Sequence, residues 1–254
     1  MDRFFVGKDN LRREEVVLEG QQAHQIHNVL RKKIGEHIIV LDNLGWEYEI
    51  ELKTIRKGKI TGQIKEKQKA KCEPVVEITL FQSLLSREKF EWVLQKCTEV
   101  GVRRFVPIVT ERSIIRQKPV KANKTERWRR IIQEAAEQSA RGRIPELEKA
   151  VNFDQAIAKL EDFSTGHLPV DYKIMAHTQG QGVSLRQCLK NGGKKIKSVA
   201  LFIGPEGGFT ENEVQSAKNN NVALISLGKR VLRTETAAVV ASSLILYQLG
   251  EMEG

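Results

Sequence analysis

The first 70 residues alternate apolar and polar positions in the way that half-buried strands do. In the stretch HIIVLDNLGWEYEIEL, residues 37–52, four large apolar side chains fall on one face and three glutamates fall on the other. Residues 59–64 form a second, shorter strand pattern, and residues 21–32 have the apolar spacing of a helix. These elements predict a small β-barrel or sandwich.

A charged stretch follows the predicted barrel. Residues 65–74, KEKQKAKCEP, are poor in apolar side chains and end at a proline, which is typical of a linker between domains. The pattern therefore predicts two domains, residues 1–72 and residues 73–254.

Beyond Pro74, apolar strands alternate with amphipathic helices. This order predicts an α/β domain with a mainly parallel sheet and helices on both faces. The strands are expected at residues 76–82, 103–109, 147–151, 172–177, 199–204 and 222–227, and the helices at residues 87–100, 124–140, 153–162 and from 211 onward.

The last predicted helix, ETAAVVASSLILYQL at residues 235–249, is small or apolar on nearly every side. Thr234 is the expected N-cap, and Gly250 is the expected end. A helix at the surface of a monomer normally has a polar face, so this helix is expected to be covered on both sides. A second copy of the chain is the simplest candidate for the outer cover.

The stretch LFIGPEGGFTENEV runs from an apolar strand into a glycine turn, Gly204–Gly208, and then into a helix. Thr210 and Glu213 have the spacing of a capping box. The turn has neither the spacing of a Walker loop nor that of a dinucleotide fingerprint, and Glu206 would repel phosphate. Glu206 suits a hydroxylated or cationic ligand, although a tight connection with no ligand explains this turn alone equally well.

A second stretch, ISLGKRVLRTETAAVV, repeats this order about twenty residues later, with an apolar strand, a turn at 228–233 and a helix. In open α/β sheets, ligands bind beyond the carboxyl ends of strands, which is where both turns fall. Glycines in such turns let backbone groups approach a ligand. The two turns together predict one binding site.

The chain has a formal net charge of +10, and residues 103–149 carry 13 Lys or Arg against 6 Asp or Glu. The arginines occur in clusters, and their planar guanidinium groups suit phosphate, so a nucleic acid is favoured over a merely solvated basic surface. Three scattered cysteines fit a reducing cytoplasm. The sequence has no apolar run long enough for a membrane span and no familiar metal-binding spacing.

At the two turns the sequence resembles a known family. GPEGGFTENEV followed by LGKRVLRTETA is similar to the paired signature of the SPOUT, or trefoil-knotted, RNA methyltransferases. The closer resemblance is to the bacterial enzymes that methylate N3 of one uridine in 16S ribosomal RNA. The stretches HQIHNVLRKKIGE, FEWVLQKCTEVGV and RWRRIIQEAAEQSARGRIPEL resemble further segments of that family, so the match covers nearly the whole chain.

The resemblance implies an N-terminal PUA-like RNA-binding barrel and a C-terminal domain whose last helix passes through a trefoil knot. It also implies a cytoplasmic homodimer that uses S-adenosyl-L-methionine and acts on 16S rRNA or the small ribosomal subunit. By resemblance, the cofactor contacts would come from both turns: Gly204, Glu206, Gly207, Gly208, Leu227, Gly228, Val231, Leu232, Thr236 and Ala237. The strand at residues 172–177 is expected to end near the same edge, so Ala176 and His177 are expected to line the pocket.

Arg233 is the expected catalytic cation, because removal of the N3 proton leaves a uracil anion and Arg233 lies between the second turn and the last helix. A structural salt bridge is an equal alternative for it. No residue is identified as a general base, and His177 is only a weak candidate. RNA contacts are expected from the arginines that the basic segments offer, with no metal ion involved: Arg31, Arg112, Arg116 and Arg141.

Three alternatives to this enzyme remain open. The chain could be an RNA-binding or ribosome-assembly protein that keeps the fold without catalysis. It could methylate a different RNA nucleotide, since similar residues could serve another base. A different nucleotide-dependent transferase is disfavoured by the missing phosphate-binding motifs.

Overall fold

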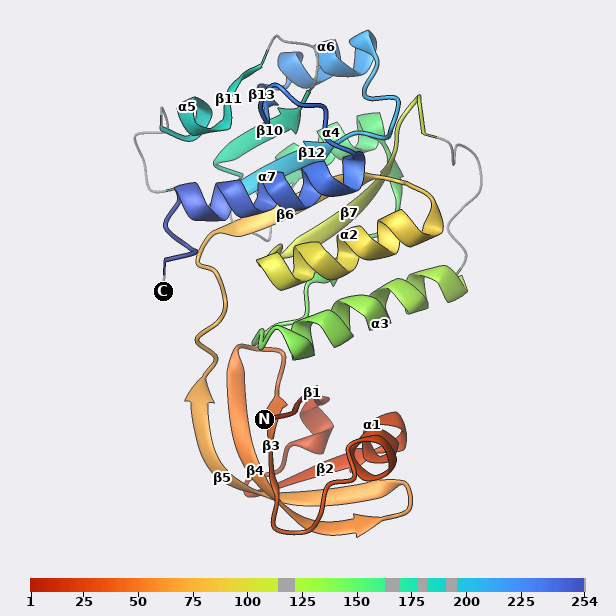
Figure 1. Cartoon of the computed structure of the whole chain (residues 1–254), viewed down its shortest axis with the longest axis vertical. Coiled ribbons are helices and arrows are strands. Elements are labelled where there is room, and N and C mark those ends of the chain that lie inside the picture. The colour runs from red at the N-terminus through yellow and green to blue at the C-terminus, as the bar shows by residue number, and fades with distance from the viewer. Residues whose placement is uncertain (114–121, 163–169, 178–181, 191–195, 254) are drawn as a thin grey trace. The chain divides into compact units, whose positions relative to one another are not determined.

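The computed structural model describes residues 1–113, 122–162, 170–177, 182–190 and 196–253 (Figure 1). The described chain forms two compact units. The first is Met1–Glu73 with Gln133–Ile144, and the second is Pro74–Ile132 with Pro145–Gly254. The division predicted after residue 72 placed residues 133–144 in the C-terminal domain, whereas in the structure they belong to the first unit.

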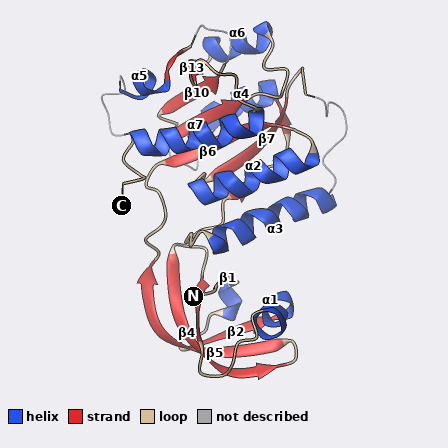
Figure 2. Ribbon diagram, in the orientation of Figure 1, coloured by secondary structure: helices blue, strands red, loops and turns tan. Residues whose placement is uncertain are grey.

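The first unit is built on a curled five-stranded sheet (Figure 2). The strand order is β1-β3-β4-β5-β2, with β1 parallel to β3 and the other pairs antiparallel. Apolar side chains on the inner face form its core, including Leu18, Ile38 and Ile50. The strands are β1 (Arg3–Phe5), β2 (Glu15–Glu19), β3 (His37–Leu41), β4 (Trp46–Arg56) and β5 (Lys59–Lys69).

The first half of the expected linker at residues 65–74 belongs to a strand, because β5 continues to Lys69. A charged, apolar-poor composition predicts a linker, but these residues pair across the sheet with β4. Lys67 lies opposite Tyr48 and Lys69 lies opposite Trp46, and the Lys67 ammonium lies 4.6 Å from the centre of the Trp46 ring. A cation over an aromatic face stabilises this end of the hairpin.

The expected helix at residues 21–32 is shorter than predicted. It consists of α1 (Gly20–His24) and a π-helical turn, η2 (Gln25–Val29), and Arg31 then has a φ of 53° that ends the helix. A 3-10 turn, η1 (Lys8–Asn10), precedes β2. The end of α3 (Ala122–Gln138) packs on this unit through Ala136, and Glu137 accepts a hydrogen bond from the backbone N–H of Phe5 at 3.0 Å.

The second unit contains an eight-stranded sheet in which every described pairing is parallel, as predicted. The strand order is β11-β13-β10-β12-β6-β7-β8, and β9 also pairs with β7. The strands are β6 (Glu77–Ser83), β7 (Arg104–Val109), β8 (Glu146–Leu147), β9 (Val151–Asn152), β10 (Tyr172–Ala176), β11 (Val183–Ser184), β12 (Ser198–Ile203) and β13 (Ala223–Ser226).

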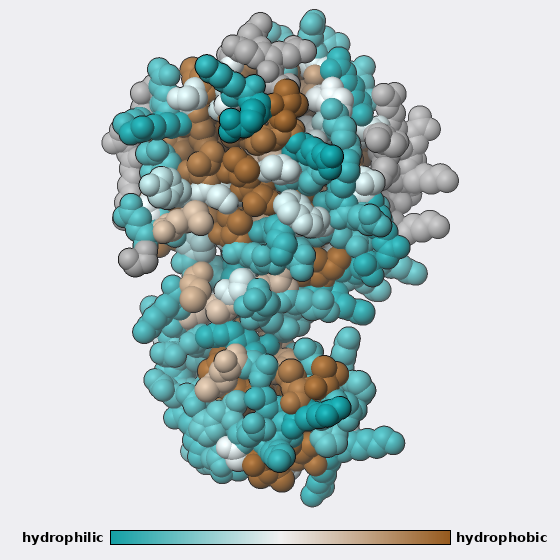
Figure 3. All heavy atoms as spheres, in the orientation of Figure 1, coloured by the Kyte–Doolittle hydropathy of each residue, from teal (hydrophilic) through white to brown (hydrophobic). Residues whose placement is uncertain are grey.

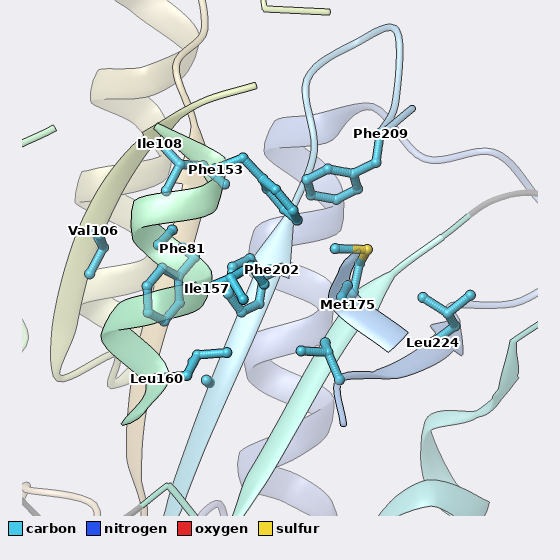
Figure 4. Close-up of a cluster of buried hydrophobic side chains, with 14 residues drawn as sticks. Phe81, Val106, Ile108, Phe153, Ile157, Leu160, Met175, Phe202, Phe209 and Leu224 are labelled. Carbon is cyan, nitrogen blue, oxygen red and sulfur yellow. The ribbon is translucent and has the colours of Figure 1, made fainter. Parts of the chain in front are cut away.

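Helices cover both faces of this sheet. One face holds a buried cluster in which the rings of Phe81 and Phe202, from neighbouring strands, stack with centroids 4.4 Å apart (Figure 4). Phe153, Ile157 and Leu160 of α4 (Phe153–Asp162) close this cluster. The remaining helices of the unit are α2 (Arg87–Val100), α5 (Leu185–Lys190), α6 (Glu211–Asn219) and α7 (Thr234–Gln248).

The helix α7 packs on α2 and on the sheet, at β6 and β12. Gly101 ends α2 with a φ of 122°, and a Cβ atom there would lie 2.8 Å from Pro74 and 3.1 Å from Leu246 of α7, so only glycine fits this contact. The inner side of α7 is buried. Its outer side exposes Leu244 at 42% and Tyr247 at 63%, and Figure 3 shows hydrophobic side chains gathered over this helix.

No helix in the described ranges is long and apolar enough to cross a bilayer.

Candidate functional site

Three carboxyl strand ends lie next to one another in the second unit, because β10 lies between β12 and β13. Ala176, the last residue of β10, is paired with Ile225, and the backbone N–H of His177 donates to the Ile225 carbonyl at 3.0 Å. The two glycine turns leave the flanking strands at this edge. The structure therefore brings the two turns to the same edge of the sheet, with Ala176 and His177 on the strand between them.

The first turn is closed by a hydrogen bond of 2.9 Å from the Gly208 N–H to the Pro205 carbonyl. Gly208 has a φ of 69°, in the left-handed region that favours glycine. The predicted capping box is confirmed: the Thr210 N–H donates to Glu213 at 2.8 Å, and the Glu213 N–H donates to the Thr210 hydroxyl at 3.3 Å. The backbone N–H groups of Thr210 and Glu213, where the turn leads into α6, therefore both have acceptors.

Arg112 braces the first turn from the loop after β7. Its guanidinium donates to the carbonyl of Gly207 at 2.9 Å and to the carbonyl of Phe209 at 3.4 Å. The neighbouring N–H of Glu111 donates to the Glu213 carboxylate at 2.9 Å. Sequence reasoning expected Arg112 to contact RNA and missed this bracing, because the partners are almost one hundred residues apart in the chain.

Glu206 forms an ion pair with Lys89 of α2, with Nζ and Oε1 2.8 Å apart. The hydrogen bond to Lys89 is the main cause of a lowered pKa for the Glu206 carboxyl, and the same bond raises the pKa of Lys89. Both side chains are about one third exposed, so the pair contributes little to stability. No pattern in the sequence singles out Lys89, since it lies in an ordinary amphipathic helix.

The second turn is held more loosely among the described residues. Gly228 has a φ of 111°, and its N–H donates to the Ser226 hydroxyl at 3.2 Å. Val231, an expected cofactor contact, is 80% exposed, and Leu232 is half-buried. This turn offers backbone and apolar groups to a ligand without a brace from a distant part of the chain.

The helix α7 begins one residue earlier than predicted. Arg233 is its N-cap, in an extended conformation with no side-chain capping bond, and Thr234 is the first helical residue. The expected N-cap at Thr234 is therefore wrong, because Thr234 is buried and Arg233 supplies the first helical acceptor, which the Ala237 N–H reaches at 2.8 Å. The Arg233 side chain is exposed at the mouth of the second turn.

The remaining expected residues lie in different places. Thr236 and Ala237 are half-buried in the first turn of α7, and Leu227 is half-buried between β13 and the second turn. The pKa of His177 is lowered by partial burial and by the charge of Lys218, which keeps the ring neutral at pH 7.

The expected RNA-contacting arginines do not form one cluster. Arg31 is exposed in the first unit, and Arg116 lies outside the described residues. Arg141 is buried and forms two bonds with Glu73, at 3.2 and 2.9 Å, so its expected contact with RNA is corrected. It also lies beyond the end of α3, and Ala140, with a φ of 59°, separates it from the helix.

The described residues contain no group of three or more His, Cys, Asp or Glu side chains that could hold a metal ion.

Two glycine turns beside one strand end are typical of α/β domains that bind small molecules. Residues 71–246 match the model of the RNA methyltransferase domain family, and the chain belongs to that family. Ribosomal RNA small subunit methyltransferase E of Bacillus subtilis is 33% identical, and the alignment covers 100% of this chain and 99% of that protein.

Solved structures agree with this membership. Ribosomal RNA small subunit methyltransferase E from Neisseria gonorrhoeae bound to S-adenosyl methionine has a TM-score of 0.84 and 29% identity, over 97% of each chain. A putative methyltransferase from Legionella pneumophila in complex with the bound cofactor SAM also has a TM-score of 0.84 and 29% identity, over 96% of each chain.

Proposed function

We propose that this chain transfers a methyl group from S-adenosyl-L-methionine to N3 of a uridine in the 16S rRNA of the small ribosomal subunit. The observation that carries the proposal is the sheet edge at which two glycine turns lie on either side of β10. Full-length similarity to a small-subunit rRNA methyltransferase, and to a structure that holds S-adenosyl methionine, supports it.

The turns fit this cofactor. A Cβ atom added at Gly208 or Gly228 would meet no atom within 4 Å, so the backbone of each turn borders open space that a side chain would fill. Exposed backbone donors and acceptors suit an adenine and a ribose, while Leu227, Val231 and Leu232 supply apolar surface. Glu206 adds a carboxylate, whose negative charge suits ribose hydroxyls or a cationic sulfonium.

S-adenosylmethionine supplies a methyl group that is activated by its sulfonium. The protein has to align the uridine N3 with that methyl group and exclude water. We assign Arg233 to stabilise the negative charge that develops on the uracil, because it caps α7 beside the second turn. The positive end of the α7 dipole also stabilises negative charge at this place.

The RNA would bind through exposed basic groups. Arg31, which is exposed in the first unit, is one candidate, and Arg112 is exposed beside the first turn while it braces Gly207. Arg116 lies outside the described residues and is proposed from the sequence alone. Residues 1–72 are proposed as the PUA-like RNA-binding domain, and residues 73–254 as the knotted methyltransferase domain. The net charge of +10 favours association with a polyanion.

We further propose a homodimer in the cytoplasm, with a trefoil knot around the last helix. The support for the dimer is the outer side of α7, where Leu244 and Tyr247 are exposed. Light scattering tests it: the unmodified protein is expected at twice the chain mass, and Leu244→Glu with Tyr247→Glu is expected at the chain mass. A monomeric unmodified protein would end this part of the proposal.

The experiment that tests the function is transfer of a labelled methyl group to small subunits from a strain that lacks this activity. We expect one modified uridine, mapped by mass spectrometry to N3. Modification at another base would identify a different RNA methyltransferase. If a folded protein neither transfers methyl groups nor binds S-adenosylmethionine by calorimetry, the chain is a non-catalytic RNA-binding protein.

A further inference from the structure

The first turns of α2 and α7 lie on the same face of the second unit's sheet. The two helices pack against each other, and α7 packs on β6 and β12 (Figure 1). The helix α2 follows the carboxyl end of β6, and α7 follows the carboxyl end of β13, so both helices begin at the carboxyl edge of the sheet. Lys89 lies in the first turn of α2, and Glu235 lies in the first turn of α7.

Two buried carboxylate or amide oxygen atoms in the second unit have no hydrogen-bond partner among the residues that the structure describes. One is Oε2 of Glu235, and the other is Oε1 of Gln82, a residue that is only 1% exposed. The Gln82 amide group donates to the Ser83 carbonyl at 3.1 Å, which leaves the oxygen as an unused acceptor. An unsatisfied buried acceptor costs free energy, so each of these oxygens indicates a place where a hydrogen-bond donor can bind.

Gln82 faces the α7 side of the sheet. Side chains alternate along a strand, and its neighbour Phe81 lies in the cluster on the opposite face (Figure 4). Gln82 is also next to the end of β6 and is paired with Ile203, the residue before the first turn. The unused oxygen of Gln82 therefore belongs to the face of the sheet on which α7 packs.

Charged groups of both signs surround this place. The pKa of Lys89 is raised mainly by its bond to Glu206, and Glu235 raises it further while Arg233 lowers it. Glu206, Glu235 and Arg233 are therefore each close enough to Lys89 to act on its charge. A carboxylate, Glu235, lies near two cations that can stabilise an anion formed beside it.

We propose that Glu235 is the general base that accepts the N3 proton of the target uridine. This inference rests on the proposed function. The N3–H bond breaks, and the proton forms an O–H bond on Oε2 of Glu235. The N3 electron pair forms the new bond to the methyl carbon, and the pair of the broken carbon–sulfur bond stays on sulfur. The proton then leaves to solvent.

Glu235 suits this role better than the other candidates. Glu206 is already bonded to Lys89, and its lowered pKa makes it a weaker base. His177 also has a lowered pKa, and its ring is attached at the end of β10, on the far side of β12 from Gln82. Glu235 combines an unused buried oxygen with a position beside Arg233.

The plain alternative is that Glu235 only complements the dipole of α7 as an acidic residue in its first turn. Glu211 offers a matched control, because it is an exposed glutamate in the first turn of α6. We would compare the unmodified protein with Glu235→Gln, Glu235→Asp and Glu211→Gln. The substrate is the unmethylated small subunit, and single-turnover rates are measured across pH 6 to 10.

Glu235→Gln is expected to lower the rate about 100-fold or more at pH 7, the size of effect that general bases have. Its rate should then rise tenfold per pH unit, because hydroxide replaces the missing base, while the unmodified protein shows a flatter profile. Glu235→Asp should recover part of the rate, and Glu211→Gln should match the unmodified protein. Calorimetric affinity for S-adenosylmethionine should be unchanged in all four proteins.

A Glu235→Gln protein with a reduced rate but an unchanged pH profile would assign Glu235 to helix stability and overturn the proposal. An unreduced rate would overturn it as well. Failure of the proposed function is distinguishable, because then the unmodified protein itself would transfer no methyl group to the subunit. Weaker cofactor binding by Glu235→Gln would instead place the residue in the cofactor site.

Discussion

The two glycine turns differ in how the rest of the molecule supports them. The first is braced by Arg112, by Lys89 through Glu206, and by the capping box that begins α6. The second has a local bond to Ser226 among the described residues, and it leaves Val231 exposed. The first turn is therefore held by distant segments of the chain, whereas the second is held by a local bond among the described residues.

The largest effect is expected where the second turn meets α7. Arg233→Ala should lower the rate of methyl transfer by about 100- to 1,000-fold, the range seen when one transition-state donor is lost. Calorimetry should find the affinity for S-adenosylmethionine nearly unchanged. If rate and affinity fall together, Arg233 supports the structure of the turn instead.

Removal of the brace should weaken the first turn. Arg112→Ala loses two charged hydrogen bonds, each of which contributes about 1.5–3 kcal/mol at most, and we expect roughly tenfold weaker cofactor binding. Arg129→Ala removes an exposed arginine of α3 and serves as the control. Equal affinity of the two variants would show that the first turn needs no brace.

Alanine at the two glycines with positive φ separates the turns further. Gly208→Ala should cost roughly 1–2 kcal/mol of stability, since the braced turn cannot relax, whereas Gly228→Ala should cost less. Both should weaken cofactor binding, because the added methyl group enters the open space beside the backbone. Gly58→Ala, at a φ of 80° in the first unit, should lose stability without losing cofactor affinity. Thermal unfolding and calorimetry measure the two effects.

The smallest effect is expected on the pH dependence of stability, through His177. Partial burial lowers the pKa of His177, so the folded state favours the neutral ring. The stability this contributes is present above the ordinary pKa of 6.5 and is lost as the pH falls from there toward the folded pKa. His177→Gln should therefore make unfolding of the second unit less sensitive to pH below 6.5. An unchanged pH dependence in urea titrations would contradict this assignment.

The local parts of this fold could be predicted from the sequence. The parallel sheet and the capping box at Thr210 follow from apolar runs and from spacing, and both are confirmed. The cofactor was predicted from the family resemblance, because no periodic pattern in the sequence indicates it. The linker prediction is wrong at Lys67 and Lys69, because composition does not reveal their cross-strand pairing with Tyr48 and Trp46.

The rest of the site depends on contacts between distant segments. Lys89 reaches Glu206 across 117 positions, Arg112 reaches Gly207 across 95, and no local pattern marks either pair. Arg141 was misjudged for the same reason, since its buried partner Glu73 lies 68 positions away. A charged residue's role is thus decided by its partner, which the sequence alone does not identify.

The most direct test of the central claim is a crystal structure with S-adenosylmethionine. We predict that the cofactor contacts the backbone of both turns, around Gly208 and Gly228, with the end of β10 between them. A cofactor that lies elsewhere, or that touches only one of the two turns, would contradict the claim that they form a single site.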